Sequence, residues 1–539
     1  MNSKSISLIF FVLLTTLFLN AQVDKSDWIA GFPDGCTSIT VGKNASIDGS
    51  VMTSHTDDSH KTRSWVNIIP PMIHKKSDKT TMYKRVSVDT LAMPAYGHEP
   101  IGSIPQVEST YGFINTAYPC MNDHQLAIGE STFGGRGELQ SNKGLIDCQR
   151  LVQLMLERCT TAREAILMAD ELTKLYGWID EGECLTIADK KEVWHFEIVG
   201  PGTDKVGAVW VAQRVPDDHI AVNANASTIK QIDLKNKDYF MASENIYEVA
   251  KENGWWKEGE EFMFCYAYAP NSRKSIAARR REWRVFDLLA PSLHLSPTSE
   301  NYPFSVKPDQ KVSVQMMIDV FKDYYEGTPY DMTRNITTTN ENGEKIVSPL
   351  ANPFLPYDQL KIQNVNGSWF YVDHETHEVS FLGERTIARW YTMYGTITQS
   401  RDWLPDEIGG VVWLAQDNIA SSIYIPVYCG VTDLPESYKT PGRTKGFNRN
   451  SAWWAFNRLG TLAAQRWGDM RHDIDNVFGP MQKNLFENQA EFEKQALEIK
   501  NIKKRKEFLT EYTMKWGEKV VNEAWDLGDF LWTKYDENF

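Results

Sequence analysis

Short strand patterns that come in pairs, each pair joined by a turn, constrain the fold of this chain most strongly. Residues 37–41 and 51–55 are rich in β-branched side chains, and the turn dipeptide Asp48-Gly49 lies between them, which predicts a β-hairpin. The same signals predict two more pairs, residues 185–188 with 193–199 and residues 206–214 with 219–224. Apolar residues three to four positions apart predict two helices, over residues 145–158 and 162–176. Strand pairs on both sides of a helix pair predict an α+β fold with layered antiparallel sheets.

The first residues of the chain have the pattern of an export signal. Lys4 precedes an apolar run from Ile6 to Leu19, and Ala21 supplies the small residue of a cleavage site. This run is too short for a membrane-spanning helix, and no later stretch approaches about 18 uninterrupted apolar residues. We therefore expect residues 1–21 to be a signal peptide, and the protein to be periplasmic or secreted with no membrane anchor after cleavage.

Charge and residue spacing exclude several partners. The 57 Lys and Arg residues against 71 Asp and Glu residues give a formal net charge of −14, which repels a nucleic-acid backbone. No H-E-x-x-H pattern occurs among the 11 histidines, and no two cysteines have C-x-x-C spacing, so we expect no metal ion and no other cofactor. The sequence leaves the oligomeric state open, and a homo-oligomer is compatible with it.

Seven cysteines are too few for a disulfide-dense scaffold in a chain of 539 residues, and most are expected to be small buried side chains. Cys36 differs because it opens a predicted strand directly after Gly35. Cleavage between these two residues would place a thiol and a free α-amine on one residue. Such an amine has a pKa of about 8, so its neutral fraction can accept the proton of the thiol. On the residues alone, a buried structural thiol remains an open alternative.

The first hairpin predicts a partner for this cysteine. If the turn is centred near Ile47, the residue that faces Cys36 on the second strand is Asp58. A carboxylate there would meet the new ammonium group and orient the cysteine. A loop position for Asp58, without a role, is the alternative.

Four stretches carry a family resemblance: Cys36–Asp58, Tyr111–Arg136, Ile220–Ser227 and Ala278–Val285. Together they resemble the PepD-like cysteine dipeptidases of the N-terminal-nucleophile (Ntn) hydrolase superfamily, over most of the chain after Cys36. The resemblance implies a four-layer αββα sandwich and activation by removal of everything before the cysteine. It predicts a propeptide at residues 22–35 and a catalytic domain with insertions at residues 36–480. The pattern of apolar residues after Pro480 adds a helical extension at residues 481–539.

The resemblance also implies site residues. Cys36 is the nucleophile, and Asp58 matches an aspartate that contacts it. The side-chain amide of an asparagine in the Val-Asn-Ala-Asn stretch donates a hydrogen bond to the oxyanion, and the alignment favours Asn225 over Asn223.

Four further residues are implied to bind substrate. His55 stands where many relatives have arginine, so the charge near the thiolate differs from theirs. A group within Glu130-Ser131-Thr132, of which Glu130 and Ser131 are the expected site residues, replaces a second oxyanion donor of other branches, and the donor atom is left open. Arg280, in the run Arg279–Arg281, is expected to anchor a substrate carboxylate, because arginine binds carboxylates in a bidentate manner.

The implied activity is hydrolysis of short peptides through a thioester acyl-enzyme, without a metal ion. An N-acyl amidase of the same superfamily is an alternative, because the same nucleophile serves both reactions. A non-catalytic exported glycan-binding protein is the alternative from another class. It is motivated by the 18 tryptophans, including the adjacent pairs at 255–256 and 453–454, although core packing is their commoner use.

Overall fold

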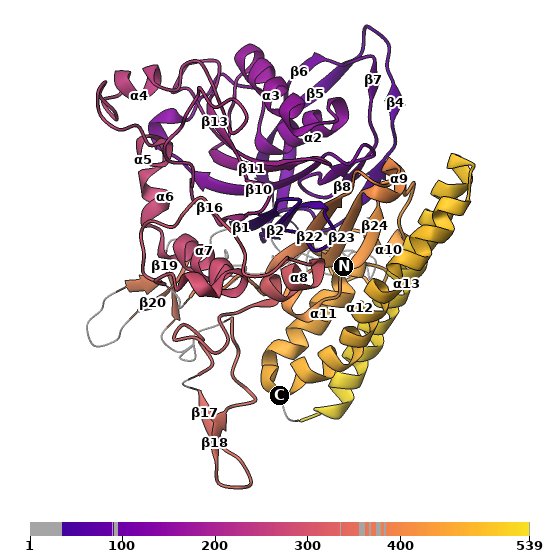
Figure 1. The fold of residues 1–539 in the computed structure, drawn as a ribbon. Coiled ribbons are helices and arrows are strands. Elements are labelled where there is room, and N and C mark those ends of the chain that lie inside the picture. The colour runs from indigo at the N-terminus through magenta and orange to yellow at the C-terminus, as the bar shows by residue number, and fades with distance from the viewer. Residues whose placement is uncertain are drawn as a thin grey trace, which may run out of the picture.

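A computed structural model describes residues 35–88, 90, 95–334, 336–354, 362–365, 368–372, 379–381 and 384–537. The predicted signal peptide and residues 22–34 of the predicted propeptide lie outside these described residues. The described chain mixes helices with two large antiparallel sheets, in agreement with the predicted α+β class (Figure 1).

The first large sheet contains Cys36. Its strand order is β16 (Ser305–Val306), β14 (Ile220–Asn223), β1 (Gly35–Val41), β2 (Val51–Asp58), β22 (Thr392–Ser400), β23 (Val411–Gln416) and β24 (Ile425–Tyr428). Every residue of β1, β2 and β22 is buried. Burial of both faces explains why these strands show little alternation between polar and apolar residues.

The second large sheet supplies the opposite wall of the site. Its order is β15 (Phe240–Ala242), β13 (Val209–Arg214), β12 (Val193–Val199), β11 (Gly182–Ala188), β10 (Ala127–Gly134), β9 (Met121–Asn122), β8 (Phe113–Asn115) and β3 (Asn67–Ile69). β1 and β2 pack against β10 and β11, so the two sheets face each other across the core.

Helices cover the outer face of each sheet (Figure 1). On the second sheet lie α2 (Cys148–Arg158) and α3 (Ala162–Tyr176), as predicted, which contact β9, β11 and β12. Each begins at a side-chain cap, Asp147 for α2 and Thr161 for α3, which satisfies free backbone N–H groups. On the first sheet lie α8 (Val314–Lys322), α11 (Ala452–Gln465) and α13 (Ile502–Lys534).

The remaining strands and α-helices surround this core. They are β4 (Met72–Ile73) with β7 (Ser109–Thr110), the long hairpin of β5 (Lys79–Val88) and β6 (Ala95–Pro105), β17 (Thr337–Thr339) with β18 (Lys345–Val347), β19 (Ile362–Val365), β20 (Ser368–Val372), β21 (Val379–Phe381), α4 (Glu248–Glu252), α5 (Phe264–Tyr268), α6 (Pro270–Lys274), α7 (Ile276–Leu289), α9 (Asp406–Gly409), α10 (Glu436–Lys439) and α12 (Trp467–Glu498).

Two of the three predicted strand pairs are confirmed. β1 pairs with β2, and β11 pairs with β12, each in antiparallel register. The third prediction was wrong, because β13 and β14 belong to different sheets. β13 pairs with β12, whereas β14 crosses to the first sheet and pairs with β1. A short turn between two strand patterns does not distinguish a hairpin from a crossing between facing sheets.

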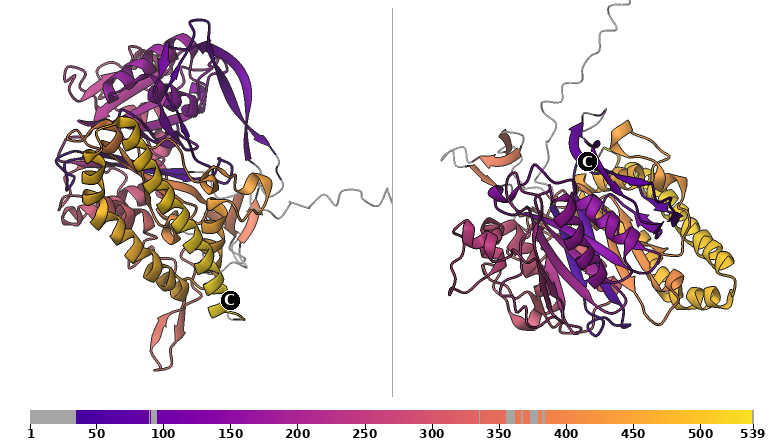
Figure 2. Two further views of the ribbon diagram at one scale, coloured as in Figure 1. Left: turned by 90° about the vertical axis from the view of Figure 1, so that its right-hand side faces the viewer. Right: turned by 90° about the horizontal axis from the view of Figure 1, so that it is seen from above.

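The C-terminal helices differ from the prediction at their start. α12 begins at Trp467 and continues through Pro480, so the predicted boundary between residues 480 and 481 lies inside a helix. Proline removes one backbone hydrogen bond, but the buried Phe478 and Leu485 anchor the helix on both sides of it. α12 and α13 lie side by side along one side of the molecule (Figure 2).

All seven cysteines are buried and free, as expected for small core residues rather than a disulfide framework. Trp453, of the pair that motivated the glycan-binding alternative, is also buried in the core. Within the described ranges, no helix combines the length and apolarity needed to cross a bilayer.

Candidate active site

Cys36 lies near the start of β1, in the middle of the first sheet. β14 pairs with one edge of this strand and β2 with the other. The Cys36 side chain is buried, yet it forms part of the wall of a cavity of about 960 Å³, together with Gly35. A central strand thus holds the thiol rigidly at the wall of a cavity that is large enough for a small ligand.

The register of the first hairpin corrects one prediction. Cys36 faces Asp57, and Gly35 faces Asp58, so the expected pairing of Cys36 with Asp58 was wrong by one residue. The turn is centred between Ser46 and Ile47 rather than on Ile47. Because side chains alternate along a strand, Asp57 shares the face of Cys36, and it also lines the cavity.

Asp58 lies on the opposite face of β2 and is held there by other partners. Its carboxylate forms an ion pair with Arg385 and accepts a hydrogen bond from Thr392 Oγ1 at 2.6 Å. Both side chains of the ion pair are nearly inaccessible to solvent. Arg385 also lies beside Gly35, so the pair borders the backbone position at which cleavage is predicted.

Replacing Asp58 with alanine is expected to lower the free energy of unfolding by about 3–5 kcal/mol, because it leaves the Arg385 guanidinium buried without a countercharge. Urea unfolding measures this loss. The double variant Asp58→Ala/Arg385→Met removes both charges and should recover most of it. An equal loss in both variants would show that the ion pair itself is not the source of the effect.

Asn225 lies next to Cys36, as the sequence predicted. Its Oδ1 accepts a hydrogen bond from the Cys36 backbone N–H at 3.0 Å, and its Nδ2 donates to the Thr132 carbonyl at 2.6 Å. Its own N–H donates to Ser131 Oγ at 2.9 Å. Asn225 has a φ of 63°, a left-handed conformation that asparagine tolerates better than most residues. Within the described residues the Nδ2 group donates only to Thr132, so its second N–H is available to a ligand.

Arg281, next to the expected substrate anchor Arg280, contacts the cysteine. Arg281 donates to the Cys36 carbonyl at 2.7 Å and to Asn225 Oδ1 at 2.8 Å, which fixes the orientation of that amide. Arg280 forms an ion pair with Glu384 at 3.2 Å and stacks over Tyr330, and none of its recorded contacts is with Cys36. Neighbouring residues on α7 project in directions about 100° apart, so adjacent arginines reach different places.

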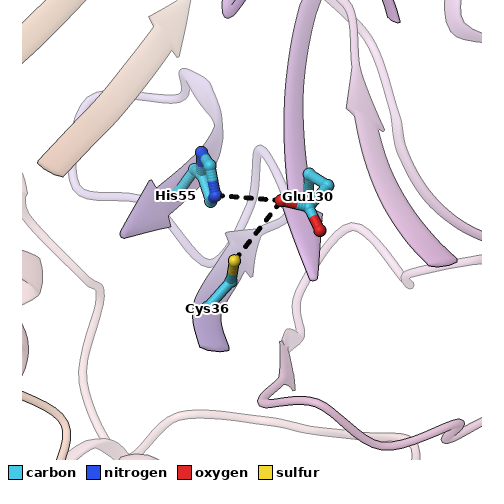
Figure 3. Close-up of side chains that lie close together, drawn as sticks. All are labelled: Cys36, His55 and Glu130. Carbon is cyan, nitrogen blue, oxygen red and sulfur yellow. Dashed lines mark hydrogen bonds and ion pairs between the residues drawn. The ribbon is translucent and has the colours of Figure 1, made fainter. Parts of the chain in front are cut away.

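Glu130 joins the thiol to a histidine (Figure 3). Cys36 Sγ donates to Glu130 Oε2 at 3.3 Å, and His55 Nε2 lies 3.2 Å from the same oxygen. Tyr394 Oη lies 3.3 Å from the other ring nitrogen of His55. Three strands, β1, β2 and β10, bring these groups together across the two facing sheets.

The charges around this cluster favour a protonated thiol and an ionised Glu130. Burial, and then the nearby Glu130 carboxylate, raises the pKa of Cys36 well above its usual value. Burial alone would raise the pKa of Glu130 too, but the contact with His55, together with hydrogen bonds from Glu183 and Cys36, outweighs it and lowers this pKa to about 2. Burial and the charge of Glu130 raise the pKa of Glu183 well above its usual value, so Glu183 holds a proton beside it.

Charged side chains line the rest of the cavity. Lys84 and Arg85 come from the long β5–β6 hairpin, and Asp147 and Asp180 lie near the start of α2. Arg85 donates to Tyr118 Oη at 2.7 Å and pairs with Asp180. Burial, followed by the charge of Asp180, raises the pKa of Asp147 to about 6. A cavity with both signs of charge suits a small ligand with an ammonium group and a carboxylate.

The sequence predicted five residues that the structure brings together: Cys36, His55, Glu130, Ser131 and Asn225. It missed Arg281, Glu183 and Arg385. Arg281 belongs to the Arg279–Arg281 run that was singled out, and helical spacing could have separated its direction from that of Arg280. No local signal marked Arg385, which meets Asp58 from 327 positions away.

Comparisons with known proteins show a similarity to peptidases. The model of peptidase family C69 matches residues 35–479. A probable dipeptidase of Latilactobacillus sakei is 28% identical over 453 residues, covering 82% of this chain and 83% of the relative. Dipeptidase A of Lactobacillus helveticus is 23% identical over 508 residues, covering 91% and 95%. A probable dipeptidase of Salmonella dublin is 24% identical over 421 residues, covering 76% and 83%.

Proposed function

Because the chain belongs to peptidase family C69, we propose that it is an exported cysteine dipeptidase that removal of residues before Cys36 activates. The predicted family is therefore confirmed, and the chain is a hydrolase. The main support for cysteine dipeptidase activity is the position of Cys36. It lies on a central strand, at the wall of a charged cavity and beside Asn225. The relatives that align with most of the chain are named as a probable dipeptidase and as dipeptidase A.

We assign the two facing sheets and their outer helices to the four-layer αββα sandwich of Ntn hydrolases. In that arrangement the nucleophile opens a central strand of one sheet and faces the other sheet. β1 and its contact with β10 support the assignment.

In the proposed reaction, the free α-amine of Cys36 takes the proton of the Sγ–H group, and the thiolate attacks the scissile carbonyl carbon. The S–C bond forms, the C–N bond of the peptide breaks, and the leaving amine takes the proton back from the ammonium group. Water then hydrolyses the thioester and restores the thiol. Asn225 Nδ2 donates to the oxyanion, and Arg281 orients Asn225 by its bond to Oδ1.

Cleavage also changes the charge at the thiol. In the uncut chain, Glu130 accepts the Sγ–H bond, and neighbouring carboxylates keep the thiol protonated. A new ammonium group on Cys36 would offset those negative charges and favour the thiolate. Once deprotonated, the sulfur can no longer donate to Glu130, and the adjacent ammonium group would supply its countercharge.

The cavity favours short peptides with free ends over N-acyl compounds. Carboxylates of Asp57, Asp147 and Asp180 line it and would attract a substrate ammonium group, whereas Lys84 could meet a carboxylate. Comparing a free dipeptide with its N-acetyl form tests this choice. Faster hydrolysis of the acetylated form would favour the amidase alternative.

Replacing Gly35 with alanine is expected to slow activation without altering the mature enzyme. A Cβ on Gly35 would lie 2.8 Å from Asn225 Oδ1 and 3.1 Å from an Arg385 nitrogen, so the cleavage site must shift. Residue 35 leaves with the propeptide, so the processed product is identical to the wild type. Intact-mass analysis over time should show a longer-lived precursor, and its product should have the wild-type kcat.

The same experiment tests activation itself. If purified wild-type protein is fully active while residues 22–35 remain attached, the proposed activation is wrong. It is also wrong if the Gly35→Ala chain shows wild-type activity before any cleavage. Periplasmic or secreted location is tested separately, by the N-terminal sequence of the protein recovered outside the cytoplasm.

A further inference from the structure

The cluster around the thiol has the donor set of a zinc site. Cys36 Sγ, His55 Nε2 and Glu130 Oε2 all lie within 4.8 Å of one another (Figure 3). Thiolate, imidazole and carboxylate are the three ligand types that bind Zn²⁺ in proteins. These three residues are 6%, 1% and 1% exposed, so the donors are already buried together.

The spacing of the donors agrees with tetrahedral coordination. Bonds of about 2.3 Å to sulfur and about 2.0–2.1 Å to nitrogen and oxygen give tetrahedron edges of about 3.5 Å for S···O and about 3.3 Å for N···O. The corresponding distances here are 3.3 Å for Cys36 to Glu130 and 3.2 Å for His55 to Glu130. An ion could therefore take the place of the Cys36 Sγ proton, and these two distances would change little.

Charge and access favour a cation at this point. Asp57, which shares the face of Cys36, adds a second carboxylate near that of Glu130. Thr132 Oγ1 forms hydrogen bonds with both Glu130 and Glu183, which brings the carboxyl group of Glu183 close to Glu130. Cys36 lines the large cavity, which offers a route from solvent and room for a water molecule as fourth ligand.

We propose that Cys36, His55 and Glu130 form an inhibitory site for a thiophilic divalent cation, with Zn²⁺ as the representative ion. Binding forms the metal–sulfur bond, breaks the S–H bond and releases that proton to solvent. The ion occupies the lone pair with which the sulfur would attack a substrate, so it blocks the thiol reversibly. The inhibition rests on the proposed function, whereas the binding does not.

Competition with a chromophoric zinc chelator measures the binding on the purified wild-type protein. We expect one tightly held Zn²⁺ per chain, and an affinity about 100-fold or more lower in His55→Gln. Co²⁺ in place of Zn²⁺ should give a thiolate charge-transfer band, which Cys36→Ser lacks. This band reports the metal–sulfur bond, so a purely structural role of Cys36 would not produce it.

Cys148→Ser is the matched control. Glu130, Cys148 and Glu183 form the other buried trio of suitable donors within the described residues, and it shares only Glu130 with the proposed site. The control should keep the wild-type affinity. Loss of binding in Cys148→Ser with retention in His55→Gln would overturn the proposal in favour of that trio, and equal affinity in all variants would overturn it outright.

Activity gives a separate result. Added Zn²⁺ should abolish dipeptide hydrolysis, and a chelator should restore it fully. If hydrolysis is present and Zn²⁺ has no effect on it, the inhibitory site is wrong while the dipeptidase proposal stands. If no hydrolysis is found but the cobalt band forms, the dipeptidase proposal fails and the metal site stands.

Discussion

Cys36→Ala is expected to lower the hydrolysis of dipeptides by a factor on the order of 10⁶, because loss of a nucleophile removes the whole covalent pathway. The variant should also keep residues 22–35 if the cleavage is autocatalytic, since the same sulfur would attack the Gly35 carbonyl. Steady-state kinetics and the intact mass of the purified protein measure the two effects. The small change in a buried side chain should leave the fold intact, which thermal unfolding checks.

Cys148→Ala is a suitable comparison for this loss. Cys148 is also a buried free thiol, but it lies at the first turn of α2 and outside the residues that line the cavity. It should retain wild-type turnover within a few-fold. If Cys36→Ala hydrolyses dipeptides at a comparable rate, Cys36 is a structural thiol and the mechanism is wrong.

Asn225→Gly is expected to reduce kcat by about 10²–10³-fold, the usual effect of losing one oxyanion donor. Glycine is chosen because it accepts the φ of 63° that Asn225 adopts, so the backbone is not strained. KM should change little, since the lost hydrogen bond forms mainly in the transition state. The measurement is made on chains whose processing has been verified by mass.

Asn223→Ala controls for the neighbouring asparagine. The Asn223 amide donates to the Ala226 carbonyl at 2.8 Å inside the same stretch, and it has no recorded contact with Cys36. Its kcat should stay within a few-fold of the wild type. A larger loss of kcat in Asn223→Ala than in Asn225→Gly would reassign the oxyanion donor.

The sequence predicted those parts of the site that depend on local pattern. Cys36 stood out because glycine precedes it and a hairpin follows, and Asn225 stood out in a short characteristic stretch. Which arginine of the run Arg279–Arg281 reaches Cys36 depended on the orientation of α7, because neighbouring residues of a helix project about 100° apart. The choice between Asp57 and Asp58 depended on the register of the hairpin. A shift of half a residue in the centre of the turn changes which of the two residues faces Cys36.

Local sequence by itself predicted the strand pairs β1–β2 and β11–β12 and the helices α2 and α3, and it marked Cys36 as a candidate nucleophile. Side-chain periodicity, caps and turn dipeptides act over a few residues, so they can be recognised without a fold. Only the tertiary structure decided that β14 leaves its neighbour β13, that Arg385 reaches Asp58, and that Glu130 meets both Cys36 and His55. These contacts join positions tens to hundreds of residues apart, and their geometry arises from the packing of two sheets against each other.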